Sequence, residues 1–554
     1  MKWLNMIGEW QRRGLGFILA GLTLIGGLFT TTGCGSGNGT ASNDQESADR
    51  LAGAKPGVKE SNPTVESPGA GQSTVDTPDN ISATSNASVE GSEWLEQQVR
   101  KAAELRGAGE YLAEAQHWKD VVSYLERTIG AGNWITAGAR LSRQVAVRLS
   151  ELEADQIQEW KQFEKLEQEY LQNRGEMTEL RVAGRVTSQQ YLTATQQQLD
   201  ILDKQAAIVQ KLFGQPTHLL ANLAEHQAET LMSVEQWESA SIAAERCLSL
   251  RQTVIQVRHP DTVSALKMLG QIAQQMKNDS LAEDCLVKAT QFAEQVWGIK
   301  NIQFATCAND LGVFYYSREN SKPNGTMRDF TKANYWLDRG LQIRREVLGD
   351  GHRLVALSRR NYALSKMAEA ATKPADRQAL DLALANSLLS LSLENLRQGD
   401  EESSRSLQWQ VLSEAATVKM LLHEYAEAET LLAEIAERWQ KDPSRMVLPM
   451  TPATLFYRWG LASAKQRSPH KLVAAGKLMQ QSIRYAETAN EEKTAISAKQ
   501  ALARLQEISR EGLEQAIPDR AIAGTPGEAP ATTESAEKAA PVRVVTLPPV
   551  DDQN

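Results

Sequence analysis

Histidine and cysteine are the side chains of this 554-residue chain that are best suited to acid–base, nucleophilic or metal chemistry. Their spacing matches none of the patterns that such chemistry uses, because there is no CxxC pair, HExxH helix, GxSxG turn or glycine-rich phosphate loop. The seven histidines are scattered: His117, His218, His226, His259, His352, His423 and His470. We therefore predict that the protein is not an enzyme and binds no metal or cofactor.

Three of the four cysteines, Cys247, Cys285 and Cys307, fall in amphipathic stretches, where cysteine ordinarily serves as a small apolar side chain. Four cysteines in so long a chain make no disulfide framework. A disulfide between Cys247 and Cys285 is compatible with export of the protein, and the sequence leaves it open. The fourth cysteine, Cys34, lies in a different setting near the N-terminus.

The N-terminus has the layout of an export signal. Lys2, Arg12 and Arg13 precede an uncharged apolar run over residues 15–29, and small and polar residues follow it up to Cys34. This run is shorter than the roughly 20 residues that a membrane-spanning helix usually needs. Residues 35–90, rich in Gly, Ser, Thr, Asn, Pro and acidic residues, are expected to form a flexible tether.

The end of the signal resembles the lipobox of bacterial lipoproteins, in which small residues precede a cysteine that is lipidated. Gly33 and Thr32 fit that pattern, whereas Thr31 stands where the family usually has Leu. The resemblance implies that Cys34 is the acylated mature N-terminus and anchors the protein at the cell envelope, facing the periplasm or the exterior. Two alternatives remain open: residues 14–33 as an uncleaved signal anchor, and ordinary cleavage to a soluble protein.

The middle of the chain contains an internal repeat. Four similar corner segments place Thr217, His259, Asn301 and His352 at spacings of 42, 42 and 51 residues. The nine extra residues of the last interval fall in a polar stretch, residues 317–329, which is predicted to be a loop. Small residues recur at the same spacing in three columns: Ala228, Gly270, Gly312 and Ala363; Ala240, Ala282 and Ala333; Cys247, Ala289 and Gly340. This pattern predicts two antiparallel helices per repeat, which cross closely at the small residues.

The repeat resembles the tetratricopeptide repeat (TPR), in the 42-residue form of kinesin light chains and many bacterial proteins. The stretches AERCLSLRQTVIQVRHPDTV and LDRGLQIRREVLGDGHRLVA carry the likeness, while Asn301 and Arg353 depart from the His-Pro corner. Weaker repeats are expected at residues 413–440, with Ala416 and Ala428, and at 452–486, with Ala462 and Ala474. The resemblance implies an all-α solenoid of roughly six helix pairs that binds proteins.

In the TPR family, the first helix of each pair lines the inner surface. Positions three residues before the first small column are therefore candidates for this surface, and neighbouring residues extend it. The candidate peptide-binding residues are Lys267, Gln271, Asn309, Tyr316 and Arg360. The cationic members favour a partner peptide that carries an acidic group. An ordinary solvated helix face is the alternative interpretation.

The segment before the repeats is also helical in pattern. Apolar residues recur every three or four positions over residues 149–171, which predicts one long amphipathic helix. We expect an N-terminal cap or a divergent repeat here, and the alternative is a coiled coil that makes the protein a self-associating, homodimeric spacer.

Composition completes the prediction. The formal net charge is −9, and no broad basic surface is evident, so a nucleic-acid partner is not expected. We predict a signal peptide over 1–33, a disordered linker over 34–93, a helical lead-in over 94–203, the repeat domain over 204–510 and a disordered tail over 511–554. The predicted function is that of a non-catalytic protein-interaction scaffold tethered at the bacterial cell envelope.

Overall fold

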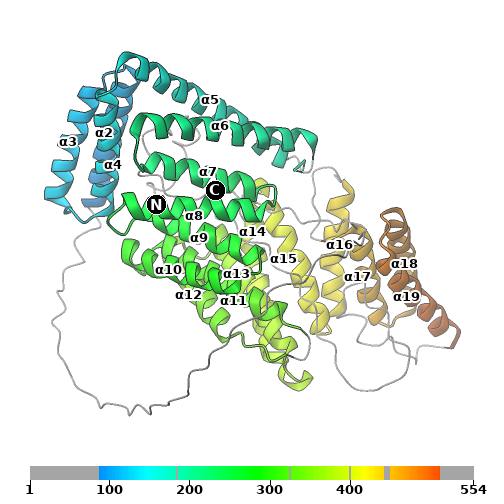
Figure 1. Ribbon diagram of the computed structural model, residues 1–554. Helices are drawn as coiled ribbons and strands as arrows, with labels where there is room; N and C mark the ends of the chain where they lie inside the picture. Colours follow the sequence, from blue (N-terminus) through cyan, green and yellow to red (C-terminus); the bar gives the residue numbers. More distant parts are fainter. Residues whose placement is uncertain are drawn as a thin grey trace, which may run out of the picture. The chain divides into compact units, whose positions relative to one another are not determined.

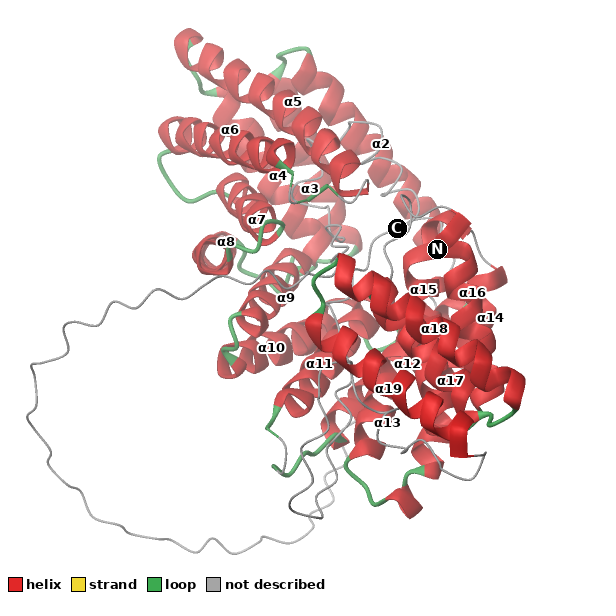
Figure 2. Ribbon diagram, turned by 90° about the vertical axis from the view of Figure 1, so that its right-hand side faces the viewer, coloured by secondary structure: helices red, strands yellow, loops and turns green. Residues whose placement is uncertain are grey.

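The structure is a computed structural model that describes residues 87–182, 185–186, 188–323, 326–398, 401–441 and 450–511. Every regular element in these residues is helical and none is a strand, as the all-α prediction requires (Figure 2). One compact unit contains the described residues from 99 onward, and residues 87–98 of helix α2 (Ala87–Gly107) belong to a second unit. The predicted signal segment, Cys34 and the tail beyond residue 511 lie outside the described residues.

Among the described helices, none is both long and apolar enough to cross a membrane. The described cysteines, Cys247, Cys285 and Cys307, are buried, and all three are free thiols. The structure therefore contains no Cys247–Cys285 disulfide.

After α2, the lead-in contains two helix hairpins, and the long helix predicted over residues 149–171 corresponds mostly to α5 (Ala154–Val182) of the second hairpin. Helix α3 (Tyr111–Thr128) packs against α4 (Trp134–Ser150), and α5 packs against α6 (Gln189–Phe213). The predicted start of the long helix at residue 149 is wrong, because α4 ends at Ser150 and the chain turns at 151–153 before α5 begins. The backbone N–H of Glu153 donates to the Gln156 side chain there, at 3.1 Å, which helps to start α5.

The apolar stripe of that segment is buried within the same chain. Leu149, Trp160, Phe163 and Tyr170 are at most 4% exposed and share a hydrophobic cluster with residues of α6 and α7. The coiled-coil alternative needs this stripe free to meet a second copy. In the described structure the stripe already serves the packing of α5 against its neighbours, so it is not available as a dimer seam.

Six helix pairs follow, each packed against the next in chain order (Figure 1). Each pair is an antiparallel hairpin, and α19 (Glu492–Glu511) packs against the last pair. The pairs are α7 (His218–Met232) with α8 (Trp237–Val254), α9 (Pro260–Gln275) with α10 (Asp279–Trp297), α11 (Ile302–Ser321) with α12 (Thr331–Leu348), α13 (Arg353–Ala371) with α14 (Ala379–Gln398), α15 (Glu401–Leu421) with α16 (Tyr425–Lys441), and α17 (Pro452–Lys465) with α18 (Pro469–Thr488).

The corner residues of the repeat are helix N-caps. Thr217, His259, Asn301 and His352 each precede the first helix of a pair, and each side chain accepts a hydrogen bond from a backbone N–H two or three residues later. An N-cap side chain satisfies one of the donors that a helix start leaves open, which is worth about 1 kcal/mol. Asn301 can therefore replace the corner histidine without loss of the cap.

The small-residue columns mark the closest helix crossings. A Cβ atom added at Gly270 would lie 2.7 Å from Cγ of Leu286, and one at Gly312 would lie 2.7 Å from Cγ of Leu337. Gly340 lies similarly close to the backbone of α11, with the carbonyl oxygen of Ala305 at 3.0 Å from such an atom. Only glycine fits these crossings, so the columns set how closely the two helices of a pair approach.

The pair of α17 and α18 departs by one position from the predicted column. Ala462 is buried as predicted, but Ala474 is only partly buried, and the neighbouring Ala475 is fully buried instead. The close approach here is made by Gly460, whose added Cβ would lie 2.9 Å from Cε of Met479. The flexible Met479 side chain fills this crossing. The small residues of α17 and α18 therefore do not keep the spacing that the other pairs show.

Two buried arginines, at equivalent positions of α8 and α12, join successive pairs. Arg251 donates to the Asp261 carbonyl oxygen at the start of α9, at 2.6 Å, and is 2% exposed. Arg344 is fully buried and donates to Ser358 of α13 at 2.9 Å and to Thr306 of α11 at 3.0 Å. A guanidinium group with several donors suits this position, where one side chain reaches two helices.

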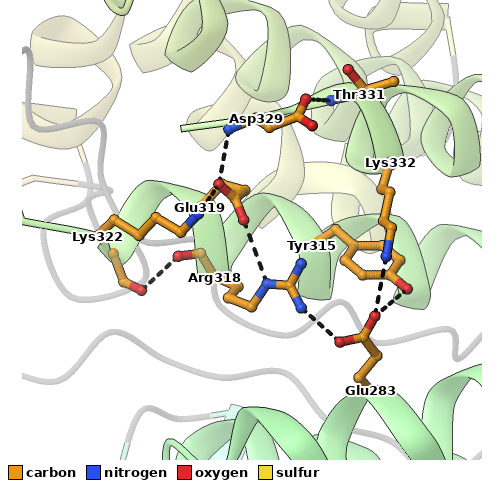
Figure 3. A network of polar contacts seen from close by, with 9 residues as sticks. Glu283, Tyr315, Arg318, Glu319, Lys322, Asp329, Thr331 and Lys332 are labelled. Atoms are coloured by element: carbon orange, nitrogen blue, oxygen red, sulfur yellow. Dashed lines mark hydrogen bonds and ion pairs between the residues drawn. The ribbon is translucent and has the colours of Figure 1, made fainter. Parts of the chain in front are cut away.

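The insertion predicted as a loop over residues 317–329 begins later than expected, because α11 continues to Ser321. A network of polar contacts holds the insertion against α10 and α11 (Figure 3). Glu283 of α10 accepts hydrogen bonds from Tyr315 at 2.8 Å and Arg318 at 2.7 Å. Glu319 of α11 accepts one from the backbone N–H of Asp329 at 2.9 Å. These contacts return the chain to the start of α12.

Candidate functional site: a polar ladder along the first helices

A line of polar side chains joins the first helices of successive pairs, from α7 to α17. Each contact connects one first helix to the next, so the residues form what we call the polar ladder. Because the helix pairs repeat in register, equivalent faces of these helices lie next to one another and their polar positions meet. The contacts are Ser264 to Glu225 at 2.8 Å, Lys267 to Asp310 at 3.1 Å, Asn361 to Asn309 at 3.1 Å, Arg360 to Glu414 at 2.6–3.0 Å, and Arg458 to Thr417 at 3.1 Å.

The structure places three of the five predicted peptide-binding residues in this ladder, namely Lys267, Asn309 and Arg360, and the other two, Gln271 and Tyr316, beside it. Three of the five are buried. Lys267 keeps 23% of its side chain exposed, and Gln271, one turn further along α9, is also partly exposed. Asn309 and Tyr316 are fully buried, and Arg360 is 4% exposed. These three side chains are thus enclosed by the fold, whereas Lys267 and Gln271 are accessible from solvent. Binding of a peptide by the five residues stays a prediction.

The contact between Arg360 and Glu414 is the most enclosed ion pair of the ladder. Arg360 of α13 donates through Nε and Nη2 to both carboxylate oxygens of Glu414 on α15, in a fork geometry that suits guanidinium and carboxylate. Burial raises the pKa of Glu414, and the adjacent Arg360 opposes that rise. The arginine therefore stabilises the charge of a carboxylate that has little access to water.

Tyr316 of α11 lies close to this ion pair. Burial raises the pKa of the Tyr316 phenol well above its usual range, and the charge of Glu414 adds to the effect. Its hydroxyl group is buried and makes no hydrogen bond to the described residues. Tyr316 therefore stays a neutral phenol that contributes packing and one unsatisfied hydroxyl group beside the ladder.

The two asparagines of the ladder leave one donor and one acceptor unsatisfied. Asn361 donates to Asn309, while Nδ2 of Asn309 and Oδ1 of Asn361 are buried without a partner among the described residues. An unsatisfied buried polar atom costs about 1–3 kcal/mol. The two unsatisfied atoms therefore reduce what this contact contributes to the packing of α11 against α13.

Sequence reasoning missed Glu414, the partner of Arg360. The candidate residues were chosen three positions before each member of the first small-residue column. Applied to Ala416, this rule selects Ser413. Glu414 is the residue after Ser413. On α15 the distance along the helix from the ladder residue to the small residue Ala416 is therefore two positions instead of three. The weak repeat over residues 413–440 would have indicated Glu414 only if the rule had allowed a shift of one residue.

The described residues offer little for covalent or metal chemistry. They contain no cluster of three or more His, Cys, Asp or Glu side chains arranged to hold a metal ion. Burial raises the pKa of Cys247 to about 12 and that of Cys285 to about 11, so both remain thiols at neutral pH. Burial lowers the pKa of His218 to about 4, and His259 and His352 serve as N-caps.

The fold defines the class of protein: within the described residues it is an all-α helical-repeat protein built from antiparallel helix pairs. No protein-family model matches the chain, and no curated protein does. Similar solved structures include BtubC from P. vanneervenii, at 12% identity and a TM-score of 0.36, over 44% of this chain and 90% of that one. A putative kinesin light chain of Podosopora anserina with TPR-like repeats matches at 14% identity and a TM-score of 0.33, over 40% of this chain and 98% of that one.

A Rap protein complexed with competence and sporulation factor is also similar, at 10% identity and a TM-score of 0.35, over 73% of this chain and 99% of that one. All three scores are below 0.5, and the identities are 10–14%. These likenesses assign no ligand or partner to the chain.

Proposed function

We propose that the protein is a non-catalytic interaction scaffold whose polar ladder binds a peptide segment of a partner protein. The observation that carries the proposal is the continuity of the ladder, which joins the first helices from α7 to α17 through charged and amide side chains. An extended or helical peptide can follow such a line and exchange hydrogen bonds with it at successive repeats.

The acidic group predicted for the partner is best placed at Lys267. This residue keeps 23% of its side chain exposed, whereas Arg360 keeps 5%. A carboxylate arriving at Lys267 would compete with Asp310, which lies 3.1 Å away and is 7% exposed.

A photo-crosslinking amino acid at Gln271 tests this proposal. Gln271 lies on α9 beside the ladder, and Lys288 on the second helix α10 serves as the control position, with 53% of its side chain exposed. We expect the full chain with the crosslinker at Gln271 to capture a partner from envelope extract, and the Lys288 version to capture none. Equal capture at the two positions would contradict a ladder-specific partner.

We also propose that the protein is tethered at the bacterial cell envelope through Cys34. The support is the sequence alone: the basic N-terminus, the apolar run and the lipobox-like residues before Cys34. Mass measurement of the mature N-terminus distinguishes the three arrangements. Acylated Cys34 supports the lipoprotein, an intact Met1 supports the uncleaved anchor, and an unmodified new N-terminus contradicts tethering.

A further inference from the structure

A small half-open cavity lies where α5, α6 and α7 meet, away from the contacts of the polar ladder. Its volume is about 60 Å³. One water molecule needs roughly 10–15 Å³ measured in this way, so the cavity holds about four to six water-sized atoms. The walls are polar for so small a space: Tyr170, Arg174, Met177, Thr178 and Arg181 of α5; Tyr191 and Gln198 of α6; Glu229, Thr230 and Ser233 of α7 and its C-cap.

Gln198 supplies the first sign of a ligand. Its side chain is 4% exposed, lines the cavity and hydrogen-bonds with Tyr170, but its Oε1 atom has no hydrogen-bond partner among the described residues. Leaving such an acceptor buried and unsatisfied is unfavourable unless a donor arrives from outside the fold. The cavity is the place from which that donor would come.

The charged groups of the cavity lie on different helices. Arg174 and Arg181 belong to α5, whereas the acceptors Gln198 and Glu229 belong to α6 and α7. Arg174 approaches Glu229 only to 3.9 Å, at the outer limit of an ion pair, so the pair is not closed by a direct hydrogen bond. Arg174 also hydrogen-bonds with Tyr170, so it is held at the cavity wall. A small molecule with both charges can lie against this wall and contact the guanidinium and the carboxylate side by side.

The ionisation of the walls suits such a molecule. Burial works against the charge of Glu229, but a hydrogen bond with His226 and the charge of Arg174 hold the pKa of Glu229 below its ordinary value. Burial raises the pKa of Tyr170 above its usual range, so this residue stays neutral and forms an aromatic wall, with its ring centroid 5.3 Å from that of His226. At neutral pH the cavity therefore presents guanidinium groups, one carboxylate and one free amide oxygen.

We propose that this cavity binds a small free α-amino acid, of the size of glycine or alanine. The carboxylate of the ligand would meet the guanidinium groups of Arg174 and Arg181, and its ammonium group would donate to Oε1 of Gln198 and to Glu229. The volume sets the size limit, since alanine has six non-hydrogen atoms and larger amino acids must leave their side chains outside. The site is independent of the proposed peptide binding along the ladder.

Calorimetric titration of the purified full chain with L-alanine tests the proposal. The comparison ligands are N-acetyl-L-alanine, which lacks the cation, L-alaninamide, which lacks the carboxylate, and inorganic phosphate. We expect saturable binding of L-alanine and binding at least about tenfold weaker for each comparison ligand, because each loses a charged hydrogen bond. No heat from L-alanine, or equal binding of any comparison ligand, would overturn the proposal.

Two variants connect that binding to this cavity. Gln198→Leu removes the unsatisfied acceptor at similar volume, and Arg174→Lys keeps the charge but loses the fork of donors. Each should weaken L-alanine binding by about tenfold. Arg140→Lys is the matched control, because Arg140 pairs with Glu126 at 2.7 Å on α3 and α4, outside the cavity. Binding of L-alanine that is unchanged in both cavity variants would contradict the site. If a variant fails to fold, the comparison of the four ligands on the natural chain still tests the proposal.

Discussion

Arg360 and Glu414 form a two-pronged ion pair that joins α13 to α15 across 54 residues of sequence. Each belongs to the first helix of its pair, so the contact links two repeats directly. The arginine had been expected to face a partner peptide, and instead it meets a carboxylate of its own chain. Its first contribution is therefore to the packing of the repeats.

Arg360→Met should destabilise the fold strongly, because it leaves Glu414 buried without its counter-charge. Breaking one side of a buried ion pair typically costs about 3–5 kcal/mol. The double variant Arg360→Met with Glu414→Leu should recover most of that loss, since no charge remains to be desolvated. Urea denaturation of the three proteins measures the difference. A double variant as unstable as the single one would refute this account.

Removing Arg360 together with Lys267 is consequently a poor test of peptide binding. Loss of capture could follow from damaged packing rather than from a lost ligand contact. Lys267→Gln alone is the better change, because its side chain is partly exposed and its ion pair with Asp310 is less enclosed. We expect it to weaken capture of an acidic partner by about tenfold. Because the change also leaves Asp310, which is 7% exposed, without this counter-charge, a thermal melt must show that the variant remains folded at the assay temperature. Unchanged capture in a pull-down would exclude Lys267 from the site.

The cap at Asn301 gives a prediction about the repeat corner. Asn301→Ala should cost about 1 kcal/mol of stability, because the backbone N–H of Gln303 loses its acceptor. Asn301→His should be close to neutral, since His259 and His352 make the same hydrogen bond through Nδ1. Chemical denaturation would separate the two variants. A histidine variant no better than alanine would show that the corner needs more than a cap.

Two glycines in helices should respond in opposite ways to alanine. Gly312→Ala should destabilise the protein, because the new Cβ would lie 2.7 Å from Cγ of Leu337 and 2.9 Å from its backbone nitrogen. Gly175→Ala should stabilise it by about 0.5–1 kcal/mol, since α5 has open space there and alanine favours helix. Thermal melting of both variants checks the contrast, and stabilisation by Gly312→Ala would refute the crossing as described.

His218 predicts a loss of stability in mild acid. Burial lowers its pKa from 6.5 to about 4, so between these values the unfolded chain binds a proton that the folded chain does not. The contribution of neutral His218 to the free energy of unfolding is therefore fully present above about pH 6.5. It is lost as the pH falls toward 4, by up to about 3 kcal/mol. His218→Gln should flatten the stability curve over this range relative to the natural chain. Parallel curves from denaturation at several pH values would contradict the assignment.

The period of the repeat was predictable from sequence because close crossings and helix caps tolerate few residue types. Gly270, Gly312 and Asn301 carry that signal locally, and the structure explains each of them. The ladder was only partly predictable. The partners Asp310 and Glu414 come from neighbouring repeats, and which polar side chain turns toward which is decided by packing between helices. The break between α4 and α5 was missed for a similar reason, since apolar periodicity continues across the turn.

The insertion between α11 and α12 shows how the repeats accommodate a change of length. Glu319 of α11 holds both ends of the added segment, because its carboxylate accepts hydrogen bonds from Lys322 and from the backbone N–H of Asp329. The register of the solenoid is thus carried by contacts between helices and not by the number of residues that connect them. For protein engineering, this makes the α11–α12 connection a natural point at which to graft an affinity tag or a reporter without shifting the repeats that follow.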